Sequence, residues 1–168
     1  LSKGGMVGQK LATRNPERLH AAVFCATSSY MGPANLWQQR IDAAQAGGME
    51  SVSEGTLERW FTPNYHSSHA SEIAKIREMI HATPVDGFAG CCIAIKDMDQ
   101  RETIKTIDLP VLVIAGAEDP GTTPAMNKLI ADSIPGAEYV ELPDSAHFCN
   151  VQATDGFNNA LADFLLKH

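Results

Sequence analysis

The chain opens with Leu1-Ser2-Lys3-Gly4-Gly5-Met6-Val7-Gly8-Gln9. Ser2 and Gly4 match the second half of a nucleophile elbow, G-x-S-x-G, whose first glycine would precede Leu1. In that turn a strained serine joins a strand to a helix, and small residues let the two elements approach closely enough to expose its hydroxyl. The alternative is an ordinary helix N-cap with a flexible start, which has the same pattern.

Two later stretches add an acid and a histidine to this serine. Asp119 directly follows the apolar run 109–116, and His147 lies in Ser145-Ala146-His147-Phe148. The chain order serine, aspartate, histidine is that of α/β-hydrolases. A neutral imidazole takes the serine proton, and a carboxylate fixes the imidazole tautomer. The sequence therefore predicts Ser2 as nucleophile, His147 as base and Asp119 as the orienting acid.

Other acids and histidines fit this chemistry less well. Glu118 precedes Asp119, but strand alternation turns one of the pair away, and an aspartate followed by proline suits the strand end better. Asp144 lies too close to His147 in sequence to approach its Nδ1 comfortably. We expect surface or core roles for the remaining histidines, which are His20, His66, His69, His81 and His168.

Composition narrows the class of protein. The 168 residues are 44% hydrophobic and 20% charged, which is typical of a globular protein with a real core. The net charge is -7 and no basic run occurs, so neither nucleic acid nor a membrane is an expected partner. The lack of an apolar span or leader predicts a cytoplasmic protein. We expect buried thiols rather than a zinc site from the four cysteines, Cys25, Cys91, Cys92 and Cys149.

Buried strands and amphipathic helices alternate in the two ends of the chain, which predicts an α/β fold. Residues 19–26 and 109–116 are nearly continuous apolar runs, as in strands covered on both faces of a parallel sheet. Residues 137–143 alternate like an edge strand. The predicted sheet order is 19–26, 111–115, 139–142, with the first strand unpaired on its outer side. The expected inner helix faces are Met6, Val7, Leu11 and Ala12; Met126, Leu129, Ile130 and Ile134; and Phe157, Leu161, Phe164 and Leu165.

Residues 31–99 form a helical block without strand-like alternation. Helices are expected over 33–46, 49–60, 70–82 and 85–95, with a break at 62–64. We interpret the block as a lid over the carboxyl ends of the strands, inserted into an α/β-hydrolase core made of 1–30 and 100–168. An independent helical subdomain with no role in catalysis is the alternative.

Several motifs are more specific than the triad. The chain resembles the C-terminal two-thirds of the 3-oxoadipate enol-lactonases, α/β-hydrolases of the β-ketoadipate pathway for protocatechuate and catechol. The resemblance covers nearly the whole chain, and its motifs are the opening stretch, Gly32-Pro33-Ala34-Asn35-Leu36-Trp37, Leu57-Glu58-Arg59-Trp60-Phe61-Thr62-Pro63, Gly87-Phe88-Ala89-Gly90-Cys91-Cys92, Asp97-Met98-Asp99 and Ala115-Gly116-Ala117-Glu118-Asp119-Pro120.

The resemblance implies hydrolysis of 3-oxoadipate enol-lactone to 3-oxoadipate by Ser2, Asp119 and His147, with no metal or organic cofactor. Lys3 stands where a methionine is more familiar in the family, but that position contributes a backbone N–H to the oxyanion, so the donor should survive. The family also implies an upstream segment that gives a second oxyanion donor. Without it, the 168 residues alone are expected to be inactive and aggregation-prone.

An anionic lactone needs a cation, and Arg59 beside Trp60 is the candidate substrate contact. The alternative is that Arg59 is solvated and Trp60 only packs. A general carboxylesterase, a carbon–carbon bond hydrolase of the same fold, and a catalytically inactive fragment stay open as other functions. The sequence does not predict an oligomeric state.

Overall fold

The computed structural model describes residues 1–168, which divide into two compact units. The core unit comprises Leu1–Ser29 and Asp99–His168, and the helical unit comprises Tyr30–Met98. No helix of either unit combines the length and the apolar character that crossing a membrane requires.

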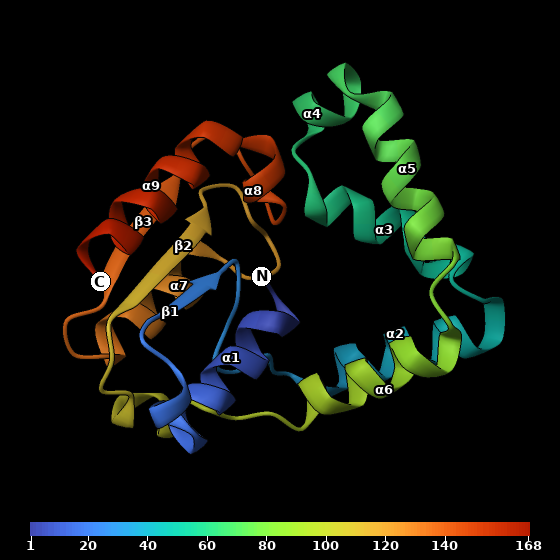
Figure 1. Ribbon diagram of the computed structural model, residues 1–168. Coiled ribbons are helices and arrows are strands. Elements are labelled where there is room, and N and C mark those ends of the chain that lie inside the picture. The colour runs from blue at the N-terminus through green and yellow to red at the C-terminus, as the bar shows by residue number, and fades with distance from the viewer. The chain divides into compact units, whose positions relative to one another are not determined.

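The core unit contains a three-stranded parallel sheet in the order β1-β2-β3, as Figure 1 shows. Its strands are β1 (Ala22–Cys25), β2 (Val111–Gly116) and β3 (Glu138–Leu142). The predicted order is confirmed, and β2, in the middle, is buried along its whole length. The predicted start of β1 at Leu19 is wrong, because Pro16–Arg18 form a 3₁₀ turn and the Leu19 N–H donates to the Pro16 carbonyl.

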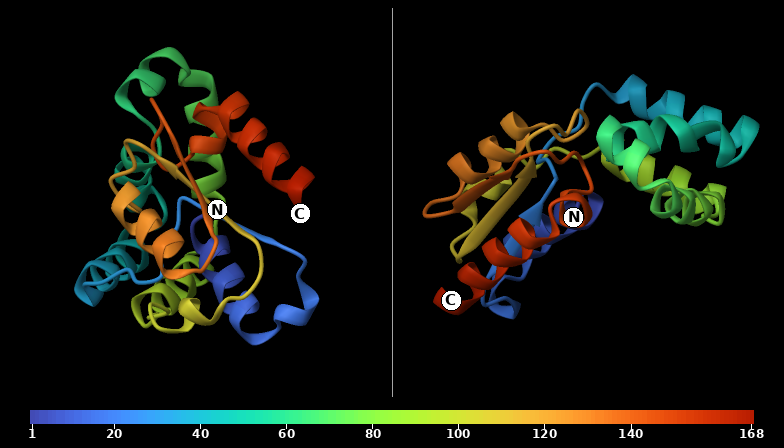
Figure 2. Two further views of the ribbon diagram at one scale, coloured as in Figure 1. Left: turned by 90° about the vertical axis from the view of Figure 1, so that its left-hand side faces the viewer. Right: turned by 90° about the horizontal axis from the view of Figure 1, so that it is seen from above.

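Helices cover both faces of this sheet. Those of the core unit are α1 (Lys3–Arg14), α7 (Pro124–Ser133), α8 (Cys149–Gln152) and α9 (Thr154–Lys167), with 3₁₀ turns η1 (Pro16–Arg18) and η2 (Thr103–Thr106). Val113 of β2 packs in one cluster with Ile130 of α7, and Ile114 packs in another with Phe164 of α9. Accordingly α7 and α9 lie on opposite sides of the sheet (Figure 2). This is the layering that a parallel sheet buried on both faces requires.

On three helices, α1, α7 and α9, the buried face differs in part from the predicted one. Four residues expected to face the core are exposed, namely Val7, Leu11, Leu129 and Leu165. Gln9 of α1 and Asn127 of α7 are fully buried instead. Each side chain donates to a backbone carbonyl inside the protein, Gln9 Nε2 to Ser28 and Asn127 Nδ2 to Thr122. Hydrogen bonds therefore set these faces, whereas the apolar periodicity alone predicted others.

The helical unit has five helices. They are α2 (Ala34–Gly47), α3 (Glu50–Trp60), α4 (Pro63–Ser68), α5 (Ala70–His81) and α6 (Val85–Lys96). The four expected helices are present, and α3 ends before the expected break, but a further helix that was not expected, α4, begins at Pro63. Thr62 Oγ1 accepts the Tyr65 N–H, and Pro63 occupies the first helical position, where its missing N–H costs nothing.

Contacts between these helices tie the unit together. α2 packs on α6 through Ile41, Ala89 and Cys92. α5 is joined to α3 by the ion pair of Arg77 with Glu54, in which Nε lies 2.6 Å from Oε1. The helical unit therefore has a small core of its own.

Two of the buried cysteines touch. Cys25 at the end of β1 and Cys149 at the start of α8 have their sulfurs 3.5 Å apart, and neither is in a disulfide. The hydrogen bond to Cys149 and burial both raise the pKa of the Cys25 thiol, so that it stays protonated at neutral pH. Cys92 is buried as expected, whereas Cys91 is partly exposed.

Candidate active site

A histidine and an aspartate meet at the carboxyl end of the sheet. Asp119 follows β2 and His147 follows β3, and His147 Nδ1 lies 2.7 Å from Asp119 Oδ2. Both side chains are withdrawn from solvent, with 8% of His147 and none of Asp119 exposed. A carboxylate at this distance holds the imidazole with its proton on Nδ1 and leaves Nε2 as the base.

The loop after β2 clamps the Asp119 carboxylate. Oδ1 accepts the Gly121 N–H at 2.8 Å and the Thr122 N–H at 3.0 Å, and Oδ2 accepts the Thr122 hydroxyl at 2.6 Å. Burial acts to raise the pKa of Asp119, but the hydrogen bonds from His147 and Thr122 outweigh it and hold that pKa below its ordinary value. The carboxylate is therefore ionised at neutral pH.

The loop that carries His147 packs against the end of β2 and the residues that follow it. The Glu118 N–H donates to the Ser145 carbonyl at 2.9 Å, and the Ala146 N–H donates to Gln152 Oε1 at 3.0 Å. At the end of β2, a Cβ added to Gly116 would lie only 2.1 Å from the Ala146 carbonyl oxygen. The two loops thus approach each other as closely as a glycine allows.

Ser2 directly precedes α1, lies beside the end of β1 and adopts a strained backbone conformation. Its φ of 52° and ψ of -124° lie where side chains other than glycine are rare. Its N–H donates to the Cys25 carbonyl at 2.9 Å, and its carbonyl accepts the Thr27 hydroxyl at 2.7 Å. The Ser2 side chain makes no capping bond to α1, which begins at Lys3. Ser2 therefore lacks the side-chain bond of an ordinary N-cap and has the strained backbone that a nucleophile elbow requires.

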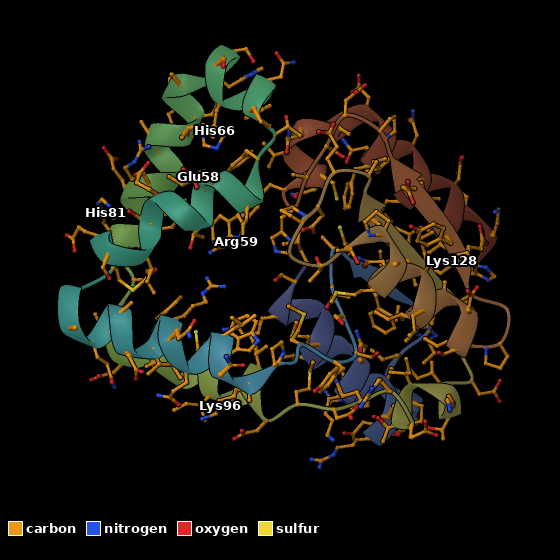
Figure 3. All side chains as sticks on the ribbon, turned by 180° about the vertical axis from the view of Figure 1, so that it is seen from behind. Glu58, Arg59, His66, His81, Lys96 and Lys128 are labelled. Atoms are coloured by element: carbon orange, nitrogen blue, oxygen red, sulfur yellow. The ribbon has the colours of Figure 1, made fainter.

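The alternative acids and histidines lie elsewhere. Glu118 and Asp144 are both exposed, whereas the carboxylate that lies against His147 Nδ1 is that of the buried Asp119. In the helical unit His66 Nε2 is 3.0 Å from the Leu57 carbonyl and His81 Nε2 is 3.1 Å from Ser53 Oγ, so both hold α3 (Figure 3). Both contacts are made within the helical unit.

Two polar residues next to the His147–Asp119 pair, Thr122 and Asn127, are not predicted by the sequence pattern. Thr122 directly precedes the N-cap of α7, which is Thr123, whose Oγ1 accepts the Met126 N–H. The Thr122 hydroxyl lies 3.1 Å from His147 Nδ1 and touches both members of the pair. Asn127 holds the loop from behind through the Thr122 carbonyl. The sequence feature that could have indicated this role is the position of Asn127, a polar residue on the inner face of an amphipathic helix.

The two residues expected to contact the substrate, Arg59 and Trp60, are the last two residues of α3 in the helical unit. Arg59 and Trp60 are both half-buried, and Glu58 and Arg59 leave the helix in different directions (Figure 3). Arg59 Nη2 lies 3.3 Å from Thr56 Oγ1, and no carboxylate pairs with it.

Comparisons with known proteins show which proteins this chain is similar to. No family model matches the chain. The chain is 32% identical over 161 residues to 3-oxoadipate enol-lactonase 2 of Acinetobacter baylyi, covering 96% of this chain and 60% of that protein. The enol-lactonase from Burkholderia xenovorans matches with a TM-score of 0.96 at 36% identity, covering 99% of this chain and 64% of that one.

A hydrolase from Pseudomonas aeruginosa matches with a TM-score of 0.94 at 40% identity, covering 98% of this chain and 62% of that one. The chain therefore has the α/β-hydrolase fold, as predicted, in partial form. It spans less than two thirds of the length of these relatives.

Proposed function

We propose that the protein carrying these 168 residues is a serine hydrolase that converts 3-oxoadipate enol-lactone to 3-oxoadipate, as in the degradation of protocatechuate and catechol. The observation that carries the proposal is the buried His147–Asp119 pair at the strand ends. The strained Ser2 is bonded to the end of β1 at the same edge of the sheet. The substrate class comes from the two relatives that are named enol-lactonases.

In the proposed mechanism, His147 Nε2 takes the proton of the Ser2 hydroxyl as its oxygen attacks the lactone carbonyl. The backbone N–H of Lys3, at the positive end of α1, stabilises the oxyanion. The ring C–O bond breaks, and the enolate that leaves takes the proton from His147 and becomes the ketone, which returns His147 to its neutral form. Water activated by His147 then releases the acyl group from Ser2, which gives the dicarboxylate product.

The helical unit would act as the lid and recognise the substrate. The lactone carries a carboxylate that takes no part in ring opening, and Arg59 is the proposed cation for it. Trp60, beside Arg59, would pack on the apolar part of the substrate.

The proposal is tested by comparing two rates of hydrolysis, that of the enol-lactone and that of each member of a panel of neutral aryl esters. Hydrolysis of the enol-lactone is monitored by the decrease in its ultraviolet absorbance. We expect kcat/KM for the enol-lactone to exceed that for every aryl ester, and Ser2→Ala to abolish both activities. Faster turnover of the esters would instead indicate a general carboxylesterase, and cleavage of carbon–carbon bonds a different hydrolase. No turnover of any of these substrates would identify a catalytically inactive fold.

A further inference from the structure

Two cysteine thiols from distant parts of the sequence meet beside the candidate triad. Cys25 is the last residue of β1, and Cys149 is the first residue of α8, 124 residues further along the chain. Their sulfurs lie 3.5 Å apart, and the two residues are only 4% and 0% exposed. No group of three or more histidine, cysteine, aspartate or glutamate side chains could hold a metal ion. The pair is therefore a buried dithiol and not part of a zinc site, which would need further ligands.

Each of these cysteines is connected to one member of the candidate triad. The Cys25 carbonyl accepts the Ser2 N–H at 2.9 Å, which fixes the elbow to the end of β1. Cys149 follows His147 by two residues. A side chain of α8, Gln152, also accepts a backbone N–H of the His147 loop at 3.0 Å. A covalent bond between the two sulfurs would therefore join the segment that carries the nucleophile to the loop that carries the base.

The two sulfurs differ in acidity. The hydrogen bond from Cys25 lowers the pKa of Cys149, and backbone N–H groups at the start of α8 lower it further, although burial and the charge of Asp119 act in the opposite direction. The same hydrogen bond raises the pKa of the Cys25 thiol, and so does burial. Only a thiolate attacks an oxidant, so a sulfur that ionises readily and a partner thiol in contact with it together suit a redox couple.

We propose that Cys25 and Cys149 form a redox site that closes to a reversible disulfide when hydrogen peroxide oxidises it. The Cys149 thiolate attacks one peroxide oxygen and breaks the O–O bond, which gives a sulfenic acid and a hydroxide that takes up the thiol proton as water. The Cys25 sulfur then attacks the sulfenic sulfur, the S–O bond breaks, and the leaving hydroxide takes the Cys25 proton as a second water. The two thiols together lose two electrons and two protons, and one peroxide is reduced to two waters. Exchange with an external dithiol reverses the reaction.

The disulfide would act on the candidate triad by moving one of its members. The sulfurs now lie 3.5 Å apart and an S–S bond is about 2.05 Å long, so they must approach by roughly 1.5 Å. Because both side chains are packed with Ile114, Leu142 and Phe164, the backbone must take up part of this shift. A displacement of either β1 or α8 changes the distance between Ser2 and His147.

We therefore expect oxidation to lower kcat roughly 10- to 100-fold, since a misplacement of about 1 Å can cost 10²-fold in rate. This effect on kcat rests on the proposed function, whereas the disulfide itself stands on the contact between the sulfurs. The disulfide should also raise the midpoint of thermal unfolding by roughly 5–20 °C, because it closes a separation of 124 residues in the unfolded chain.

Peptide mapping after peroxide treatment tests the site without any substitution. Hydrogen peroxide is the probe because it is little larger than water and can reach buried sulfurs. Trypsin cuts after lysine and arginine, and it places the cysteines in three peptides, namely Cys25 in 19–40, Cys149 in 129–167, and Cys91 with Cys92 in 78–96. We expect peroxide to link 19–40 to 129–167, and dithiothreitol to separate them. A link from 78–96 in place of this one, or no link at all, would overturn the proposal.

Variants separate the disulfide from other oxidative damage, because peroxide also oxidises methionine in every variant. Cys149→Ala lacks the thiolate that reacts first, and it should keep the same kcat with and without peroxide. The wild type should lose activity and regain it with dithiothreitol. The double variant Cys91→Ala/Cys92→Ala is the matched control and should respond like the wild type. Circular dichroism identifies a variant that does not fold, and Cys25→Ala, which lacks the second thiol, then replaces Cys149→Ala.

Failure of the proposed function gives a different pattern from failure of the redox site. Linked peptides and a higher thermal midpoint, in a protein that hydrolyses no lactone or ester, would remove the hydrolase proposal and keep the disulfide. Lactone hydrolysis without linked peptides would keep the hydrolase and overturn the redox site. Linked peptides with an unchanged kcat would overturn the effect of the disulfide on the triad.

Discussion

The backbone N–H of Thr27 donates to Asn127 Oδ1 at 3.0 Å, although 100 residues separate the two along the chain. The bond joins the segment after β1 to α7. On one side, the Thr27 hydroxyl donates to the Ser2 carbonyl. On the other, Asn127 Nδ2 donates to the Thr122 carbonyl, and the Thr122 hydroxyl donates to Asp119. A buried chain of hydrogen bonds thus connects the elbow to the acid of the candidate triad.

Asn127→Ala should therefore damage both stability and catalysis. It leaves the Thr27 N–H and the Thr122 carbonyl without a partner, and each orphaned buried group costs about 1–3 kcal/mol. We expect urea denaturation to show a loss of at least that size in the free energy of unfolding. Turnover measured on the folded fraction should show a lower kcat with little change in KM, because Asn127 positions the triad without touching substrate.

Asn158→Ala is the control for Asn127, because Asn158 lies exposed on α9. It should leave both quantities within about 0.5 kcal/mol of the wild type. Equal effects of the two substitutions would mean that the network does not position the triad.

The triad assignment predicts a large difference between two neighbouring acids. Asp119→Asn should lower kcat by roughly 10⁴, because the imidazole then loses its correct tautomer. Glu118→Gln should leave kcat unchanged, since Glu118 is exposed and the carboxylate at His147 Nδ1 is that of Asp119. The comparison uses steady-state kinetics at neutral pH. A loss in Glu118→Gln as large as that in Asp119→Asn would contradict the assignment.

The strand positions and the order of the sheet were readable from the sequence because β2 is apolar at every position, as a strand covered on both faces must be. Asp119 and His147 were readable because each follows a recognisable strand. The distance between the two side chains could not be predicted from the sequence, since it depends on hydrogen bonds from Thr122 and on the close approach at Gly116. Those contacts come from loops packing against each other, and local patterns do not encode them.

The helix faces were the weaker part of the prediction. A hydrophobic pattern on α7 places Leu129 inside, yet Leu129 is exposed and Asn127 is buried. Burying asparagine is favourable only because its amide finds partners in segments far away in sequence.

The pKa of Asp119 predicts how the fold responds to acid. Because this pKa is lower in the folded protein than in the unfolded chain, the ionised carboxylate stabilises the fold above an unfolded value of about 3.9. That contribution is lost as the pH falls through the lower, folded value. Thr122→Val removes a hydrogen bond that lowers the pKa. We expect the variant to unfold at a higher pH than the wild type when the acid transition is followed by circular dichroism.

Thr106→Val provides the control for this experiment, because the Thr106 hydroxyl is exposed and donates only to the Thr103 carbonyl. It should unfold at the wild-type pH. Coincident acid transitions of Thr122→Val and the wild type would show that the Thr122 hydroxyl does not set the charge state of Asp119.

Gly116→Ala should show how tightly the loop that carries His147 packs against the end of β2. The new Cβ would meet the carbonyl oxygens of Ala146 and Ser145 at 2.1 and 2.7 Å. Both are backbone atoms, so no side-chain rotation relieves the clash, and the loop that carries His147 must move. Overpacking of this kind costs about 1–3 kcal/mol or more. We expect denaturant unfolding to show that loss, together with a fall in kcat on the folded fraction as His147 shifts from Asp119.

Gly90→Ala makes the matched comparison, because nothing lies within 4 Å of a Cβ added at Gly90 and the residue sits in the interior of α6. There the alanine should stabilise the protein by roughly 0.5–1 kcal/mol, since it restricts the unfolded chain and favours helix. The two substitutions add the same methyl group and should therefore have opposite signs. If Gly116→Ala were as stable and as active as Gly90→Ala, the loop bearing His147 would not be held against the end of β2, and the distance between His147 and Asp119 would need another explanation.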